Sequence, residues 1–192
     1  KCFLPYGDVI ISDDLSQDNT VKIAKKYGAK VIPRQIKGFV ENKKEADFIS
    51  ENRQIDEYFT PAHKDFVSVK PIEEWFRIRD EKGKFTINYK KWIYENGIGI
   101  YADEYETSIG DQETARKILV ALDLKPLIIV DKTRRKYMYG DYEIAFDKVV
   151  GLGDFVEIEY KGKDTVDPKE ETRKMIEFLK SQNCGKIEIN NG

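Results

Sequence analysis

GLGDFVEIEYKG, residues 151–162, carries two carboxylates, Glu157 and Glu159, two positions apart in a segment that otherwise reads as a β-strand. Side chains alternate between the two faces of a strand, so the two glutamates share one face and Val156 and Ile158 share the other. If the acidic face meets solvent, the segment is an ordinary half-buried strand. If it faces inward, two like charges need a cation beside them, and the rest of the chain decides between these alternatives.

Charged or polar side chains recur at the same spacing of two in other predicted strands. They are Arg77 and Arg79, Asn88 and Lys90, Glu104 and Glu106, Lys132 and Arg134, and the single carboxylate Asp147. Solvated faces usually mix signs, because like charges at neighbouring positions repel one another. Strands that are wholly cationic or wholly anionic favour an inward face with a basic and an acidic side. Arg and Lys bind phosphates, and carboxylates bind hard divalent cations, so such a face suits a polyanion bound with metal ions.

Seven predicted strands and two predicted helices follow residue 50. The strands are 53–60, 74–80, 84–92, 101–107, 125–140, 142–149 and 154–162, and the helices are 111–122 and 168–181. Mostly antiparallel strands with two helices predict an α+β fold, an antiparallel β-barrel with flanking helices.

The first 50 residues differ in character from the rest. Residues 9–12 and 30–32 are predicted strands around a helix at Thr20–Tyr27, a βαβ-like segment, and a second helix is predicted around Glu41–Ser50. We therefore expect two parts, residues 1–50 and residues 51–192. The chain lacks an initiator Met, so a fragment, a fusion and a chimera all remain open.

Composition excludes several classes of protein. The chain has 33 Lys and Arg against 35 Asp and Glu, so its net charge of −2 argues against a nucleic-acid or anionic-membrane partner. No apolar run approaches the roughly 20 residues that span a bilayer. One histidine and two distant cysteines argue against a zinc site, a disulfide framework and a Ser-His-Asp triad, so a cytoplasmic location is expected.

Five segments in a fixed order, FRIRD, FTINYK, EYET, VDKTRRKY and FDKVVGLGDFVEIE, resemble the CYTH superfamily of triphosphate tunnel metalloenzymes. That superfamily includes class IV adenylyl cyclases and thiamine triphosphatases. The resemblance covers about residues 52–181, and RQIDEYF (53–59) matches an early strand of the family. It implies a β-barrel tunnel that binds a triphosphate-containing small molecule, either ATP, thiamine triphosphate or inorganic triphosphate, together with Mg²⁺ or Mn²⁺.

The resemblance also implies roles for single residues. Phosphate binding would fall to Arg77, Arg79, Lys90, Lys132 and Arg134, of which Lys90, Lys132 and Arg134 would be catalytic. The metal would be held by Glu157 and Glu159, with Glu104, Glu106 and Asp147 as further carboxylates. The reaction is either cyclisation or triphosphate hydrolysis, the residues do not separate the two, and a homodimer is left open.

The chain departs from the family at one strand. The family opens with a Glu-x-Glu-x-Lys strand that helps to bind metal and substrate, but here the only such string is Glu157–Lys161, at the family's later position. We therefore expect anion binding with reduced or absent turnover, and a non-catalytic polyphosphate- or nucleotide-binding module is the alternative. Residues 7–50 resemble the start of family-two glycosyltransferases, with Asp13 and Asp14 by the nucleotide, but a later Asp-x-Asp is missing, which disfavours a glycosyltransferase.

Four aromatic residues could stack on a nucleobase, but packing in the core is the commoner role of aromatic residues in strands. They are Tyr58, Trp75, Trp92 and Tyr137. We expect all four in the core, and His63 in an exposed loop.

Overall fold

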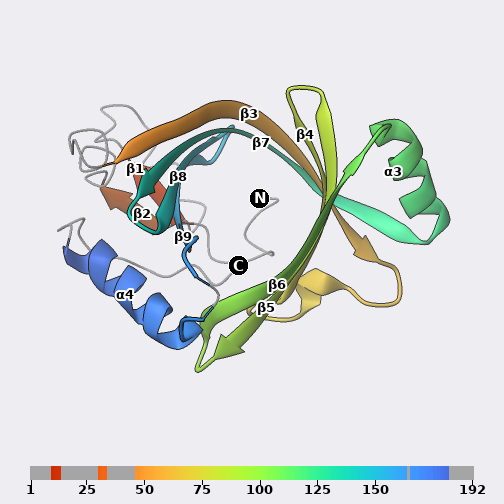
Figure 1. Cartoon of the computed structure of the whole chain (residues 1–192). Coiled ribbons are helices and arrows are strands. Elements are labelled where there is room, and N and C mark those ends of the chain that lie inside the picture. The colour runs from red at the N-terminus through yellow and green to blue at the C-terminus, as the bar shows by residue number, and fades with distance from the viewer. Residues whose placement is uncertain (1–9, 14–29, 34–45, 164, 182–192) are drawn as a thin grey trace. The chain divides into compact units, whose positions relative to one another are not determined.

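A computed structural model describes residues 10–13, 30–33, 46–163 and 165–181 of the chain (Figure 1). The chain divides into two compact units. The central unit is residues 52–132. The terminal unit comprises the described residues up to 51 and those from 133 onward. Strands β3 (Asp47–Pro61) and β7 (Leu124–Tyr139) contribute residues to both.

The central unit is a sheet with strand order β7-β3-β4-β5-β6. Its other strands are β4 (Glu74–Glu81), β5 (Lys84–Glu95) and β6 (Ile98–Ile109), and the β3–β4, β4–β5 and β5–β6 pairs are antiparallel. Two tight turns, Lys82-Gly83 and Asn96-Gly97, join them, and all four of these residues have positive φ, as the common two-residue hairpin turn requires. A short 3₁₀ helix, η2 (Phe66–Ser68), lies between β3 and β4.

One face of the central sheet packs against helix α3 (Gln112–Ala121), drawn in green in Figure 1. The helix begins at Asp111, whose carboxylate accepts hydrogen bonds from the backbone amides of Glu113 and Thr114. Its buried Leu119 forms a core with Phe59 of β3 and Ile78 of β4. This core fixes which face of each central strand is apolar.

Replacing Ile78 by Ala is expected to lower the free energy of unfolding by about 2–5 kcal/mol, because Ile78 is fully buried and the smaller side chain leaves a cavity. Ile118→Ala on the exposed side of α3, where the side chain is 54% exposed, is the control and should cost much less. Urea unfolding of both variants measures the difference. Equal losses of stability in the two variants would contradict the assignment of Ile78 to the core.

The terminal unit has strand order β2-β1-β9-β8-β7. Strands β1 (Ile10–Asp13) and β2 (Lys30–Pro33) are parallel, whereas β1–β9 and β8–β9 are antiparallel, with β8 at Tyr142–Val149 and β9 at Gly153–Tyr160. Helix α4 (Pro168–Ser181) contributes Phe178 to a core built on Tyr137 and Ile144. None of the helices in the described ranges is long and apolar enough to cross a membrane.

The predicted elements after residue 52 are confirmed, with ends that differ by a few residues. The two predicted N-terminal strands also form, and their parallel pairing agrees with a βαβ-like segment. The helix predicted around Glu41–Ser50 is wrong over 47–50, which belong to β3, because Phe48 and Ile49 favour a strand and Phe48 packs edge-on against Tyr137 of β7. Thr20–Tyr27 lies outside the described residues, and the boundary at residue 50 stays a prediction. His63 is exposed, as expected.

Candidate functional site

Charged side chains of the central unit gather on the face of the sheet opposite to the core. Ile78 packs in the core under α3, so its neighbours Arg77 and Arg79 point to the other side. Register places Arg79 opposite Asp56, and Arg77 opposite Asn88. We call this side the charged face; it comprises Asp56, Arg77, Arg79, Asn88, Lys90, Glu104, Glu106 and Lys132.

Asp56 is the centre of this face and is fully buried. Its carboxylate accepts two hydrogen bonds from Arg79, at 2.6 Å from Nε and 2.7 Å from Nη2. Nη1 of Arg77 lies 3.7 Å and Nζ of Lys132 lies 3.9 Å from the same carboxylate. Burial by itself would raise the pKa of Asp56, but the hydrogen bonds from Arg79 and the nearby positive charges outweigh it and hold the pKa below its ordinary value.

No role was predicted for Asp56, although it lies in the RQIDEYF segment that supported the family resemblance. The available signal was the period-two row Gln54, Asp56, Tyr58, which alternates with Ile55 and Glu57 along the strand. The sequence does not show which cations contact this carboxylate, because the register between the strands determines those contacts.

Three buried side-chain atoms of the described residues have no hydrogen-bond partner, and all belong to residues on this side of the sheet. They are Gln54 Oε1, Arg77 Nε and Thr86 Oγ1. A buried donor without a partner costs about 1–3 kcal/mol, so an unsatisfied guanidinium N–H is uncommon. A phosphate oxygen could accept a hydrogen bond from Nε of Arg77. The charged face is therefore suited to binding an oxyanion.

The two glutamates of β6 are held by their neighbours on β5. The side-chain amide of Asn88 donates to Glu104 at 2.8 Å and to Glu106 at 3.2 Å. Nζ of Lys90 lies 3.3 Å from Glu104. Burial opposes ionisation of Glu104, but Asn88 and Lys90 prevail and lower its pKa. Glu104 is thus ionised at neutral pH and balances Lys90.

In the terminal unit, Arg134 brings two of the predicted metal-binding carboxylates together. It donates to both oxygens of Asp147 at 2.6 Å and to Glu157 at 2.6 Å. Burial works against the charge of Arg134, but these two carboxylates outweigh it and raise its pKa. Glu159 contacts Lys161 at 2.6 Å and stands opposite Glu143 in the register.

Within the terminal unit, successive basic side chains of β7 point to opposite faces of the strand. Arg134 and Lys136 contact carboxylates of β8, with Nζ of Lys136 lying 2.9 Å from Glu143. Arg135, between them, contacts Glu51 at 2.7 Å instead. The basic run KTRRK is therefore split between two faces and does not form one continuous basic patch.

The predicted metal-binding carboxylates are spread over the strands. Among the residues that the structure describes, no group of three or more His, Cys, Asp or Glu side chains is placed to hold a metal. Mg²⁺ usually takes one or two protein carboxylates, and substrate phosphates and water complete its shell. The half-exposed Glu157 and Glu159 fit that requirement as oxygen donors, with side chains 49% and 44% exposed.

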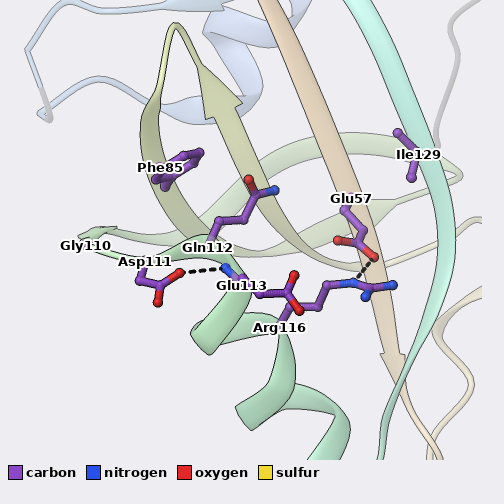
Figure 2. Close-up of a pocket in the computed structure, with 8 residues that line it drawn as sticks. All are labelled: Glu57, Phe85, Gly110, Asp111, Gln112, Glu113, Arg116 and Ile129. Carbon is purple, nitrogen blue, oxygen red and sulfur yellow. Dashed lines mark hydrogen bonds and ion pairs between the residues drawn. The ribbon is translucent and has the colours of Figure 1, made fainter.

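A groove of about 480 Å³ lies on the other side of the central sheet, at the N-terminal end of α3. Figure 2 shows Arg116 reaching from α3 to Glu57 of β3, with Asp111 capping the helix beside them. The Arg116 Nε donates to Glu57 at 2.8 Å. None of the eight residues that line the groove is a predicted site residue, so it does not contribute to the candidate site.

The aromatic residues behave in two ways. Tyr137 is in the core of the terminal unit, which confirms that part of the expectation. Tyr58, Trp75 and Trp92 are partly buried and belong to neither hydrophobic cluster of the described residues, so their packing in the core stays a prediction. Alternation places them on the side of the central sheet that carries the charged face.

Comparison with known proteins agrees with the pattern of the strands. The family profile described as CYTH domain matches residues 29–187, and thus starts before residue 52, where the sequence resemblance began. A protein of Methanocaldococcus jannaschii named "putative adenylate cyclase" is 34% identical over 142 residues, which are 74% of this chain and 79% of that protein.

Solved structures of archaeal proteins are similar as well. The PH1819 protein from Pyrococcus horikoshii is 28% identical with a TM-score of 0.66, over 80% of this chain and 87% of that chain. A conserved hypothetical protein from Pyrococcus furiosus is 26% identical with a TM-score of 0.62, over 77% and 83%. These likenesses confirm the predicted fold class, an antiparallel β-barrel with flanking helices. The chain belongs to the CYTH family.

Proposed function

We propose that the chain binds a triphosphate-containing small molecule together with Mg²⁺ or Mn²⁺ and catalyses phosphoryl or nucleotidyl transfer on it. The phosphates are bound by Arg77, Arg79, Lys90 and Lys132 of the central unit and by Arg134 of the terminal unit. The metal is held by Glu157 and Glu159, with Asp147, Glu104 and Glu106 as supporting carboxylates.

One observation carries this proposal: three cations gather around the fully buried carboxylate of Asp56. Such a concentration of cations suits a bound polyanion, because Arg and Lys side chains bind phosphate oxygens. Arg77 also keeps a buried Nε–H without a partner. Guanidinium groups hold phosphate oxygens through several directed hydrogen bonds, so Arg77 is suited to a bound phosphate.

The charged face lowers the barrier of phosphoryl transfer mainly by positioning. In such reactions negative charge on the transferred group is held by preplaced cations while the attacking and leaving oxygens are aligned. Arg79 is held in place by two hydrogen bonds to Asp56, and Lys90 is held by Glu104. Neither cation therefore has to change position when phosphate binds. A bound divalent ion would add further neutralisation of phosphate charge, as CYTH proteins are generally metal-dependent.

Relatives point to two possible reactions. The Methanocaldococcus jannaschii protein is named for adenylate cyclase activity. A Hippeastrum protein of known structure, 16% identical to this chain with a TM-score of 0.54, is titled "putative adenylyl cyclase" with dominant triphosphatase activity. With ATP, cyclisation releases pyrophosphate and leaves cyclic AMP, whereas hydrolysis releases inorganic phosphate and leaves ADP.

Product analysis distinguishes the two reactions. The chain is incubated with ATP, thiamine triphosphate or inorganic triphosphate and with Mg²⁺ or Mn²⁺, and the products are separated by chromatography. We expect metal-dependent product from at least one substrate. Tight binding in calorimetry without any product would favour the alternative, a non-catalytic nucleotide- or polyphosphate-binding module. Neither binding nor product from any of the three would refute the proposal.

The metal assignment leads to a mutational prediction. Glu157→Gln combined with Glu159→Gln is expected to weaken the metal dependence of triphosphate binding far more than it weakens folding. Both side chains are nearly half exposed, and exposed ion pairs contribute little to stability. Titrations with Mg²⁺ at fixed triphosphate measure the effect, with Glu170→Gln on α4 as a control carboxylate, 55% exposed. An unchanged metal dependence in the double variant would remove Glu157 and Glu159 from the metal site.

A further inference from the structure

Gln54 lies beside the cations of the charged face and is almost completely buried, at 2% exposure. It comes two residues before Asp56 on β3, so both side chains project from the same side of the sheet. In the register Gln54 stands opposite Glu81 of β4, which makes it a diagonal neighbour of Arg79. The amide group of Gln54 is therefore next to a cation that we assign to phosphate binding.

Hydrogen bonds to Glu81 fix the orientation of this amide group. Nε2 of Gln54 donates to one carboxylate oxygen at 2.5 Å, and the side-chain amide of Asn52 donates to the other at 2.6 Å. An ionised carboxylate only accepts hydrogen bonds, so the NH₂ group of Gln54, and not its carbonyl oxygen, faces Glu81. The carbonyl oxygen Oε1 is left buried, without a hydrogen-bond partner among the described residues.

Thr86 of β5 carries a second buried oxygen of this kind. It is the register partner of Arg79 and lies on the same side of the sheet. Its hydroxyl oxygen Oγ1 likewise has no partner within the part of the chain that the structure describes. Gln54 and Thr86 thus flank Arg79 from the two neighbouring strands. Buried polar atoms nearly always have a partner, so two without one beside a single cation point to a bound molecule.

The chemistry of the two oxygens narrows the choice of that molecule. A phosphate oxygen would repel the carbonyl oxygen of Gln54, because both accept hydrogen bonds and both carry negative charge. A metal or ammonium ion would be attracted by oxygen atoms, but the guanidinium group of Arg79 repels a second cation. Water is neutral and donates two hydrogen bonds, which suits a carbonyl oxygen and a hydroxyl group next to a bound phosphate.

We propose that Gln54, with Thr86, holds the water molecule that attacks the terminal phosphate of the bound triphosphate, so that the reaction is hydrolysis. The water oxygen forms a bond to the terminal phosphorus, and the bond from that phosphorus to its bridging oxygen breaks. The bridging oxygen keeps the electron pair and leaves with the diphosphate part. One hydrogen of the water stays on the new orthophosphate, and the other is released to solvent as a proton.

A neutral amide group can orient water without accepting its proton. Phosphoryl transfer requires the attacking and leaving oxygens to be in line, and correct placement of the nucleophile supplies much of the rate. Acceptors that hold the O–H bonds of the water leave a lone pair free to face the phosphorus. Gln54 is suited to this role because Glu81 fixes its amide group. This inference rests on the proposed function, since the triphosphate must occupy the charged face.

Kinetics and calorimetry of the full chain separate water positioning from phosphate binding. Inorganic triphosphate with Mg²⁺ is the substrate, and the release of orthophosphate gives kcat. Titration with imidotriphosphate, whose bridging nitrogen resists hydrolysis, gives the affinity. Gln54→Leu removes the acceptor oxygen and is expected to lower kcat by about 10- to 100-fold. The affinity for imidotriphosphate should stay nearly unchanged, because the cations remain in place.

Two further comparisons keep the test independent of one variant. Thr86→Val removes the hydroxyl group and is expected to lower kcat about three- to tenfold, whereas Thr86→Ser keeps the hydroxyl group and should retain the wild-type kcat. Asn52→Leu removes the other amide group from Glu81 but leaves both buried oxygens in place. Its kcat should fall much less than that of Gln54→Leu. Should Gln54→Leu fail to fold in urea titrations, Thr86→Val against Thr86→Ser decides.

Three outcomes overturn the proposal. In the first, the wild-type chain binds inorganic triphosphate with Mg²⁺ and releases no orthophosphate. In the second, Gln54→Leu or Thr86→Val keeps the wild-type kcat, which would show that the oxygen binds a structural water only. In the third, Gln54→Leu lowers kcat and the affinity for imidotriphosphate by the same factor. If no triphosphate binds the wild-type chain, the proposed function itself has failed, which is a separate result.

Discussion

Replacing Asp56 by Asn is expected to lower the free energy of unfolding by about 3–5 kcal/mol, because it removes a fully buried negative charge from among buried cations. Arg79 would lose both of its short hydrogen bonds to an ionised partner, and Arg77 and Lys132 would lose a neighbouring negative charge. Most small domains are stable by only about 5–15 kcal/mol, so the variant should be close to unfolding. Urea unfolding at pH 7 measures the loss.

The central unit offers a matched control for this change. Arg53 and Asp131 form an ion pair with the same two-point geometry, at 2.9 and 2.6 Å, but Arg53 is 65% and Asp131 is 30% exposed. Asp131→Asn should therefore cost far less stability than Asp56→Asn. Similar losses for the two variants would show that burial of Asp56 does not set its energetic importance.

Acid should reveal the same interaction. Because the folded pKa of Asp56 is depressed, its contribution to stability is present above the unfolded value of about 3.9. The contribution is lost as the pH falls through the lower folded pKa. The wild-type chain is expected to lose stability below about pH 4 more steeply than Asp56→Asn does. Parallel pH profiles for the two proteins would contradict the pKa assignment.

Arg77→Gln is expected to weaken triphosphate binding by about 10- to 100-fold, the equivalent of one charge-assisted hydrogen bond. The fold should persist, since Arg79 keeps its two hydrogen bonds to Asp56. Calorimetric titration of the variant with inorganic triphosphate and Mg²⁺ gives the affinity. Where the wild-type chain turns over substrate, kcat/KM should fall in parallel.

Arg53→Gln serves as the control for Arg77→Gln. It removes the same charge from the same unit, but Arg53 is exposed and contacts Asp131 on the other side of β3. Loss of net charge alone would weaken binding equally in both variants. A specific site predicts a large effect for Arg77→Gln and a small one for Arg53→Gln, and the reverse order would reject the charged face as the phosphate site.

The sequence predicted the strands well because charged and apolar residues alternate over long stretches. Arg77, Ile78 and Arg79 show why: one residue must be buried, so its neighbours must lie on the opposite face. The same pattern failed over 47–50, where two adjacent apolar residues, Phe48 and Ile49, interrupt the alternation. Strand alternation gives the face of a residue, but it does not give its partners.

Partners depend on register, which no local pattern contains. The sequence does not indicate a role for Asp56, because its importance comes from Arg79 on the next strand. Trp75 was assigned to the core because aromatic residues in strands are usually core residues. Helix α3 packs on the side of Ile78, so the ring of Trp75 lies on the opposite side of the sheet, together with Arg77 and Arg79. The predicted metal ligands Glu157 and Asp147 likewise share Arg134, a contact that their sequence positions did not indicate.

Nitrogen-15 NMR of the arginine Nε–H groups tests the central claim most directly, because it reports on each guanidinium separately. Titration of the wild-type chain with inorganic triphosphate and Mg²⁺ is predicted to shift the signals of Arg77, Arg79 and Arg134. The signals of Arg53, Arg116 and Arg135, which contact carboxylates on other faces, should stay in place. Saturating triphosphate that leaves the first three signals unmoved, or shifts the second three instead, would contradict the account.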